Sequence, residues 1–201
     1  MELAILISGR GSNLGAILRA VQDQRLDARV QVVVSNRPSA GGLDLAGEAG
    51  VATAVLEHGA FPGREEYDAA LVALLRERGV DTVALAGFDR LVSGVFLRAF
   101  PGRVLNVHPA LLPAFKGLHA QRQALDYGAR IAGVTVHFVD EQMDHGPIIA
   151  QATVPVLDDD TEQSLSERLL AEEHRIYPLA LQRLARGELR LAGRRVIGGL
   201  P

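Results

Sequence analysis

The sequence contains no cysteine, and this absence removes several kinds of chemistry. Disulfides, thiolate metal ligands and a cysteine nucleophile are all excluded. Lysine is almost absent as well, because Lys116 is the only one among the 21 basic residues. A Schiff-base mechanism would therefore depend on this single side chain. The other basic residues are arginines, whose planar guanidinium suits bidentate binding of carboxylate or phosphate.

Long hydrophobic runs are also missing. No apolar run reaches the roughly 18 residues that suggest a membrane span, and runs such as 30–34 have the length of strands. The chain enters an apolar segment at once, without the basic region of a signal peptide, so we expect a cytoplasmic protein. The net charge is −3 and no basic block carries interleaved aromatics. We therefore expect no nucleic-acid partner, and the lack of a long apolar run indicates no membrane partner. Small-molecule partners and a monomer or homodimer are further expectations that do not follow from the charge.

Strand-like and helix-like segments alternate through the first half of the chain. Short apolar runs typical of strands occupy residues 3–8, 30–35, 52–56, 82–86 and 104–107. Helical patterns fall between them at 14–21, 43–49 and 64–78. This rhythm predicts right-handed βαβ units, and therefore an α/β fold with a Rossmann-like, mostly parallel sheet flanked by helices.

The pattern changes after about residue 110. Two strand-like segments, 133–139 and 148–156, are joined by the turn-rich segment 140–146, which predicts an antiparallel extension in the C-terminal half. We expect a long terminal helix over 165–186, interrupted at Pro178, and a last edge strand over 189–197.

The first candidate for chemistry is the glycine-containing turn at 9–13, between the first strand and the first helix. Free N–H groups at the positive end of a helix dipole favour a phosphate. An ordinary turn capped by Ser12 or Asn13 is an equally good interpretation. The dinucleotide fingerprint needs a third glycine at Leu14 and an acidic residue in place of 35–36. No lysine follows as in a Walker loop, so a small phosphoester fits better.

The second candidate is a pair of polar residues at the end of the fifth predicted strand. Asn106 and His108 are two positions apart, so both side chains emerge on one face. Ligands bind at this carboxyl edge in open α/β sheets. An amide donor and an imidazole both suit an oxygen that becomes negative when a carbonyl is attacked. The alternative is a strand end whose polar groups satisfy the backbone.

The third candidate is the turn at 140–147, which contains Asp144. A turn rich in Asp and Gly is normally a solvated turn. It becomes functional only if Asp144 folds back toward His108, where a carboxylate would fix the imidazole tautomer and help to relay a proton.

The other histidines favour simpler roles. We expect His58 to be exposed, His119 to line a helix start and His137 to be a hydrogen-bonded structural residue. No His-x-x-x-His or comparable spacing indicates a metal site, so none is expected. No Gly-x-Ser-x-Gly elbow marks a serine nucleophile.

Taken together, several segments resemble one family, the phosphoribosylglycinamide formyltransferases, which are folate-dependent enzymes of purine (IMP) synthesis. The matching segments follow in the family's order at 5–14, 85–88, 106–109, 111–113, 115–120, 133–139, 144–147 and 173–178. The resemblance covers nearly the whole chain and implies one formyltransferase domain over 1–201. Its phosphate-binding half would be 1–105, and its catalytic and folate-binding half 106–201.

The resemblance implies transfer of the formyl group of 10-formyltetrahydrofolate, a co-substrate, to the amine of N1-(5-phospho-D-ribosyl)glycinamide. Asn106, His108 and Asp144 would form the catalytic group. Gly11, Ser12 and Asn13 would bind the substrate phosphate, and Glu173 its ribose and amine side. The folate-binding residues would be Arg64, Asp89, Arg90, Leu91, Val92, Asn106, Asp140, Glu141, Gln142, Met143 and Asp144. A cis peptide is expected between Leu112 and Pro113.

The sequence departs from the family's pattern at three positions in or near the implied binding sites. Asp89 stands where the family usually has an apolar residue, and Leu170 and Ala171 are less polar than is typical near the substrate phosphate. None of the three belongs to the catalytic group.

Three other functions compete with this interpretation. Methionyl-tRNA formyltransferase would need a further C-terminal domain and a basic surface. A formyltetrahydrofolate hydrolase would release the formyl group to water, and normally carries an N-terminal regulatory domain. A non-catalytic phosphosugar-binding module would use the turn at 9–13 but would not need Asn106, His108 and Asp144 together.

Overall fold

The computed structural model describes residues 1–200 and falls into two compact units. The first unit is Met1–Asn106, and the second begins at Val107. Among the described residues, no helix is at once long and apolar enough to cross a lipid bilayer.

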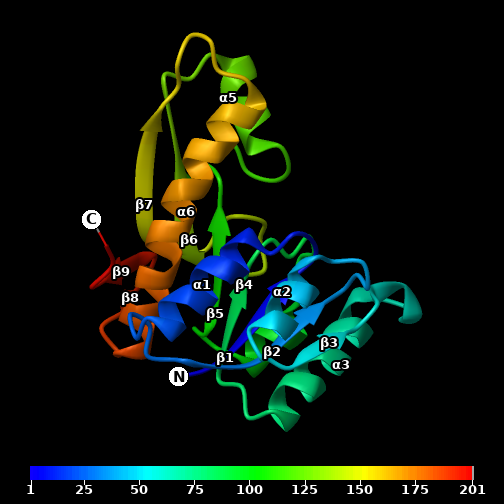
Figure 1. Ribbon diagram of the computed structural model, residues 1–201. Helices are drawn as coiled ribbons and strands as arrows, with labels where there is room; N and C mark the ends of the chain where they lie inside the picture. Colours follow the sequence, from blue (N-terminus) through cyan, green and yellow to red (C-terminus); the bar gives the residue numbers. More distant parts are fainter. Residues whose placement is uncertain (201) are drawn as a thin grey trace. The chain divides into compact units, whose positions relative to one another are not determined.

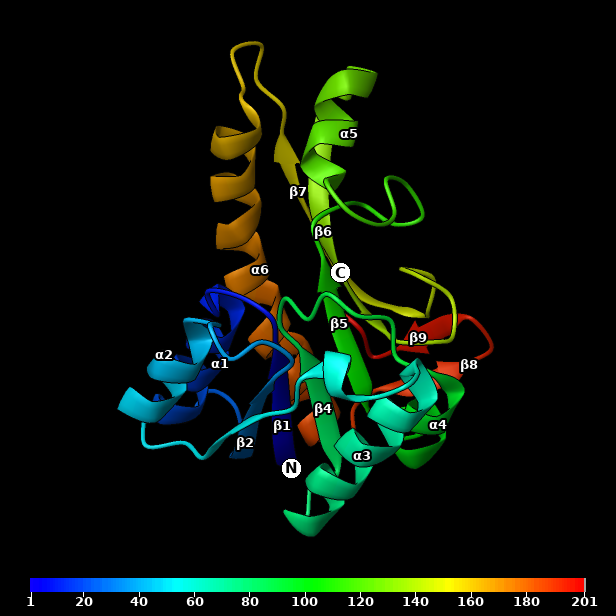
Figure 2. The same cartoon turned by 90° about the vertical axis from the view of Figure 1, so that its right-hand side faces the viewer.

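The first unit is a parallel sheet with helices on both faces. Its strands are β1 (Glu2–Ile7), β2 (Arg29–Ser35), β3 (Thr53–Val55), β4 (Thr82–Leu85) and the first three residues of β5 (Val104–His108), in the order β3-β2-β1-β4-β5. Its helices are α1 (Ser12–Gln22), α2 (Gly42–Glu48), α3 (Arg64–Glu77) and α4 (Gly94–Ala99), with a 3₁₀ turn η1 (His58–Ala60). Helices α1 and α2 cover one face of the sheet, while α3 and α4 cover the other (Figures 1 and 2).

This arrangement explains the apolar runs of the first half. Strand β1 is fully enclosed from Leu3 to Ile7, and β4 is buried along its whole length. Strands that are covered on both faces read as continuous apolar segments rather than as alternating ones. The predicted mostly parallel, Rossmann-like α/β fold is confirmed in this unit, and the five predicted strands lie within two residues of their expected bounds.

The second unit is built on an antiparallel hairpin. Its strands are β6 (Ile131–Phe138), β7 (Ile148–Pro155), β8 (Arg190–Ala192) and β9 (Arg195–Ile197), and its helices are α5 (Ala120–Tyr127) and α6 (Glu162–Ala185). Strand β6 pairs antiparallel with β7, and β9 follows on the other side of β7. Helix α6 lies along β6 and β7 (Figure 1). The predicted antiparallel extension is confirmed.

Two details of the predicted second half were wrong. Helix α6 continues through Pro178 without interruption. Proline removes one backbone donor and costs about 3 kcal/mol in a helix interior, but Ile176, Tyr177 and Pro178 are all buried, so packing of this turn outweighs the loss. The segment 189–197 is a hairpin of β8 and β9 rather than one strand, because Gly193 turns the chain with φ +61°. Helix α4 was not predicted. Of α5 only the start was predicted, at His119, which is its N-cap residue.

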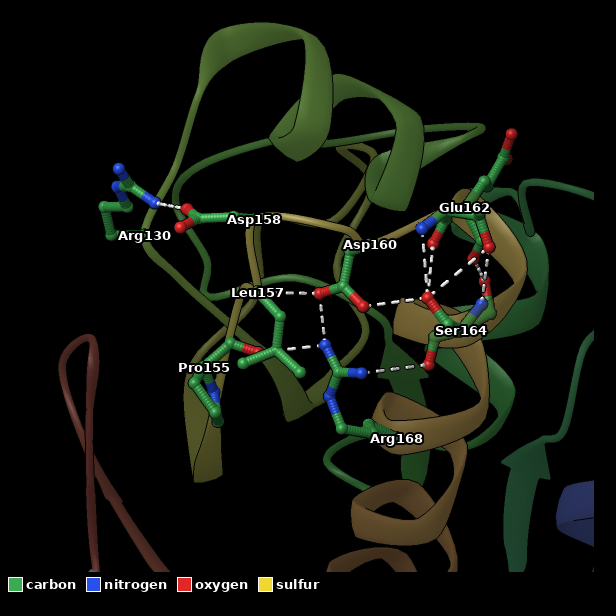
Figure 3. A network of polar contacts seen from close by, with 10 residues as sticks. Arg130, Pro155, Leu157, Asp158, Asp160, Glu162, Ser164 and Arg168 are labelled. Atoms are coloured by element: carbon green, nitrogen blue, oxygen red, sulfur yellow. Dashed lines mark hydrogen bonds and ion pairs between the residues drawn. The ribbon is translucent and has the colours of Figure 1, made fainter.

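The N-terminus of α6 is held by a polar network (Figure 3). The Thr161 hydroxyl accepts a hydrogen bond from the Ser164 N–H, and the Ser164 hydroxyl accepts one from the Thr161 N–H, which together form a capping box. The Asp160 carboxylate accepts from the Leu157 N–H at 2.7 Å and forms an ion pair with Arg168. Hydrogen bonding from Arg168 is the main reason that the pKa of Asp160 is lowered to about 2.

The lowered pKa makes a prediction about acid stability. Because the folded pKa of Asp160 lies below its ordinary value of 3.8, its contribution is complete above that value and is lost as pH falls through about 2. We expect Asp160→Asn to lower Tm at neutral pH, with the difference from wild type closing near pH 2. Thermal melting between pH 7 and 2 measures it. Asp158→Asn, which removes an exposed ion pair with Arg130 in the same loop, should leave Tm nearly unchanged; a constant Asp160 difference at all pH values would contradict the argument.

Candidate active site

Strand β5 ends in the two polar residues that the sequence singled out. The buried residues Val104 and Leu105 fix the strand, and Asn106 is in register with Leu85 of β4. Because side chains alternate along a strand, Asn106 and His108 point to the same face of β5. Only 5% of His108 is exposed, so its ring depends on protein partners.

Both nitrogens of the His108 ring face oxygen acceptors. Nε2 lies 2.9 Å from the backbone carbonyl oxygen of Phe115. Nδ1 lies 3.3 Å from Oδ2 of Asp144. A carbonyl oxygen and an ionised carboxylate can only accept, so the ring satisfies both contacts when each nitrogen carries a hydrogen. This geometry suits an imidazolium.

Asp144 reaches His108 because its own backbone is folded into the left-handed region, with φ +47°. Its Oδ2 accepts a second hydrogen bond from the Gly117 N–H at 2.8 Å. Its side chain is only 11% exposed. The turn that contains Asp144 is therefore not simply solvated, and its carboxylate is held in place by a backbone donor and by a ring.

A second histidine lies on the other side of the same carboxylate. Nε2 of His137 is 3.8 Å from Oδ1 of Asp144, and its Nδ1–H donates to the Phe138 carbonyl at 2.8 Å. Burial lowers the pKa of His137 below its usual value, more than the neighbouring carboxylate raises it. The ring is therefore neutral at pH 7, and His108 faces the carboxylate charge without a competing cation. The sequence predicts a structural role for His137, and only its position on the same strand face as Thr135 and Val139 could have indicated more.

The remainder of the predicted folate turn is more open. Asp140 accepts hydrogen bonds from the Gln142 N–H at 3.0 Å and contacts Nδ1 of His145 at 2.7 Å. Glu141, Gln142 and Met143 are exposed. This turn therefore combines a rigid, buried carboxylate with an accessible surface beside it.

The predicted phosphate turn has neither Ser12 nor Asn13 as its cap. Gly11 is the N-cap residue of α1, in the left-handed conformation with φ +79°, and no side chain caps the helix. A Cβ at Gly11 would stand 2.8 Å from the Cα of Gly42. Ser12 is half-buried and Asn13 is 7% exposed. The turn is thus built from closely packed backbone, with no acidic side chain in the first turn of the helix.

The other residues predicted to bind folate in the first unit are the segment 89–92 and Arg64, which begins a helix. Arg64 is the exposed first residue of α3. Arg90 lies over the ring of Tyr67, 5.0 Å from its centroid. In the second unit, Glu173 is buried on α6. The expected cis peptide between Leu112 and Pro113 is confirmed.

Comparison with known proteins decides the family. A protein-family model described as formyl transferase matches residues 1–181 of this chain. The chain belongs to the formyl transferase family. Among residues 1–200 of this formyl transferase, no three His, Asp or Glu side chains form a group that could hold a metal ion.

Several relatives of this formyl transferase carry names that describe a reaction. Phosphoribosylglycinamide formyltransferase of Escherichia coli is 44% identical over 191 residues, which cover 95% of this chain and 90% of that protein. The human trifunctional purine biosynthetic protein adenosine-3 is 46% identical over 94% of the chain, which spans only 19% of that longer protein. The crystal structure of glycinamide ribonucleotide transformylase 1 from Symbiobacterium toebii has a TM-score of 0.97 and 53% identity, covering 98% of this chain and 93% of that chain.

The close approach in the phosphate turn makes a testable prediction. Gly11→Ala should destabilise this formyl transferase in two ways. The left-handed backbone costs about 1 to 2 kcal/mol, and the collision with the Gly42 backbone adds roughly 1 to 3 kcal/mol. Gly50→Ala is the matched control, because Gly50 has φ +71° with open space around it. Urea unfolding measures the loss in free energy of unfolding for both variants, and the difference between them is the cost of the collision with Gly42. Equal losses in the two variants would show that the backbones of residues 11 and 42 move apart without cost.

Proposed function

We propose that this chain transfers the formyl group of 10-formyltetrahydrofolate to the amine of N1-(5-phospho-D-ribosyl)glycinamide. The products are the N-formyl compound and tetrahydrofolate. One observation carries the proposal: the buried Asp144 carboxylate lies 3.3 Å from Nδ1 of His108, at the end of a strand that also bears Asn106. The names of relatives with 90% coverage support the same reaction. The cytoplasmic location and the monomeric or homodimeric state expected from the sequence stay predictions.

In this mechanism the substrate amine attacks the formyl carbon. A C–N bond forms to the amine, and the carbonyl oxygen becomes negative in the tetrahedral intermediate. The amide N–H of Asn106 and an N–H of protonated His108 stabilise this oxyanion. In the structure Nε2–H of His108 donates to the Phe115 carbonyl, so the proposal requires that the formyl oxygen replace this partner when substrate binds.

Collapse of the intermediate breaks the bond between the formyl carbon and the folate N10. The attacking amine must lose a proton and N10 must gain one. Asp144 is the group that serves this transfer, because its carboxylate is fixed by the Gly117 N–H and balances the His108 charge. No covalent enzyme intermediate is needed.

The substrates would occupy the positions that the family resemblance assigns. The phosphate would bind at Gly11, Ser12 and Asn13, where backbone N–H groups begin an 11-residue helix without an acidic first turn. Glu173 would bind the ribose and amine side. The folate would bind at the segment 89–92, at Arg64 and Asn106, and at the turn 140–144. We also propose the two halves as 1–105 for phosphate binding and 106–201 for catalysis and folate binding.

The hydrolase alternative differs in one measurable way. A formyltransferase releases tetrahydrofolate only when the amine is present, whereas a hydrolase releases it with water alone. We expect an absorbance assay for deformylated folate to give signal only after addition of the glycinamide ribonucleotide. Equal rates without the amine would replace the proposed function by hydrolysis, and no rate in either condition would favour a non-catalytic phosphosugar-binding module.

Replacement of Asp144 tests the carboxylate. Asp144→Asn keeps the shape but cannot balance the His108 charge or take a proton, so turnover should fall roughly 100-fold or more. Because the Gly117 N–H can still donate to the amide oxygen, the melting temperature should change little. Asp158→Asn is the control, since Asp158 is an exposed carboxylate of the same unit. Turnover within a few-fold of wild type for Asp144→Asn would remove the carboxylate from the mechanism.

Inorganic phosphate tests the assignment of the glycine turn. If Gly11, Ser12 and Asn13 bind the substrate phosphate, free phosphate should compete with the ribonucleotide and not with the folate. Initial rates at several phosphate concentrations, with each substrate varied in turn, measure this. Competition against the folate would show that the turn at 11–13 belongs to the folate site and not to the ribonucleotide site.

A further inference from the structure

The segment that follows β4 is anchored by an unusual charged cluster. Asp89 Oδ1 accepts hydrogen bonds from the Ser8 hydroxyl at 2.8 Å and from the Asn36 amide at 2.9 Å. Asp89 Oδ2 forms an ion pair with Arg37. The Asp89 N–H donates back to the Ser8 hydroxyl at 3.0 Å. We call Ser8, Asn36, Arg37 and Asp89 the Asp89 cluster.

The cluster ties together three neighbouring strand ends. Ser8 follows β1, Asn36 and Arg37 follow β2, and Asp89 lies beyond β4. The Ser8 hydroxyl oxygen also lies 2.6 Å from Asn36 Oδ1, and its one hydrogen can point to either acceptor, so the polar groups are joined into one network. Burial raises the pKa of Asp89, but the hydrogen bonds from Asn36 and Ser8 and the Arg37 charge outweigh it and lower the pKa below its usual value. The carboxylate is therefore charged throughout the neutral range.

Helix α3 holds the same segment from its other end. The Arg90 guanidinium lies over the Tyr67 ring. The Ser93 N–H donates to the Asp68 carboxylate, which is 1% exposed, at 2.5 Å. Between these anchors Leu91 presents an apolar side chain that is 45% exposed. The backbone from 89 to 93 is thus fixed at both ends while its middle stays accessible.

We propose that Asp89 is a positioning residue for folate binding, which it performs by holding the segment 89–92 in its binding conformation through the Asp89 cluster. The proposal rests on the proposed function, because that function assigns this segment to the folate. A free loop of four residues would lose backbone conformational entropy when it became ordered on binding. A segment that is already ordered before binding avoids this cost. Loss of the Asp89 cluster should therefore weaken the binding of folate and leave the rate of the chemical step unchanged.

The experiment measures kcat and both KM values for variants of the cluster. Asp89→Leu removes every side-chain partner and should raise KM for 10-formyltetrahydrofolate roughly tenfold, with kcat and the ribonucleotide KM within about twofold of wild type. Arg37→Leu should raise the folate KM by a smaller factor, about threefold. The double variant should resemble Asp89→Leu alone, since the two residues act through one contact. Asp89→Asn, which can still accept from Ser8 and Asn36, should restore much of the affinity.

Asp81→Leu is the matched control. Asp81 also links strands, since it accepts hydrogen bonds from the Glu2 N–H at 3.1 Å and from the Thr82 hydroxyl at 2.6 Å, but at the start of β4. The Asp81→Leu variant should lower Tm without changing the KM for folate. Amide hydrogen exchange of residues 89–93 should accelerate in Asp89→Leu and slow again on addition of folate.

Three results would overturn the proposal. They are an unchanged folate KM in Asp89→Leu, an equal rise of both KM values, and an equal effect of Asp81→Leu. If wild type transfers formyl while these results appear, only the role of Asp89 fails. If wild type neither transfers formyl nor binds reduced folate by calorimetry, the proposed function fails and the role of Asp89 fails with it.

Discussion

The contact between the Asp144 carboxylate and the His108 ring is the constraint on which the proposed chemistry depends. A carboxylate placed 3.3 Å from a nearly buried imidazole stabilises the charged ring and fixes its orientation. The carboxylate is held by this ring and by the Gly117 N–H, because a buried polar group without hydrogen-bond partners is costly. A left-handed backbone at Asp144 brings the carboxylate to its backbone donor, and the left-handed conformation of Gly117 is one that glycine adopts without steric cost. The strained conformation at Asp144 persists where the surroundings require it.

The second unit provides the rigid frame for this contact. Gly146 packs so closely that a Cβ there would stand 1.8 Å from the Phe138 carbonyl oxygen. The turn between β6 and β7 is therefore drawn tightly against the end of β6, and Asp144 is carried with it. The buried His137 contributes a second ring without a second charge, because burial keeps it neutral. The Asp144 carboxylate therefore lies between two imidazole rings.

In the first unit, closely packed backbone and charged anchoring side chains hold the segments proposed for ligand binding. Its glycine turn packs against Gly42, and its segment 89–93 is tied to three strand ends and to α3. Both features lie after the carboxyl ends of parallel strands, where α/β sheets bind ligands. Proteins that resemble this chain occur as a separate Escherichia coli protein and as one part of a longer human protein. The same fold is therefore used in chains of very different length.

Local pattern was sufficient for the architecture and for the candidate residues. Alternating apolar runs and helical spacing predicted a parallel first half and an antiparallel second half, since these periods record which faces are buried. Strand-end position identified Asn106 and His108, and turn composition drew attention to Asp144. Family resemblance supplied the reaction and the cis peptide at Pro113.

The tertiary structure decided what depends on contacts between distant segments. It folded Asp144 back to His108, set His137 beside the same carboxylate, and gave Asp89 its partners at the ends of β1 and β2. It also carried α6 through Pro178, where burial outweighed a local penalty. The physical reason is the same in each case. Periodicity reports the environment of one segment, whereas a hydrogen bond between two segments depends on backbone turns and packing that no single stretch of sequence encodes.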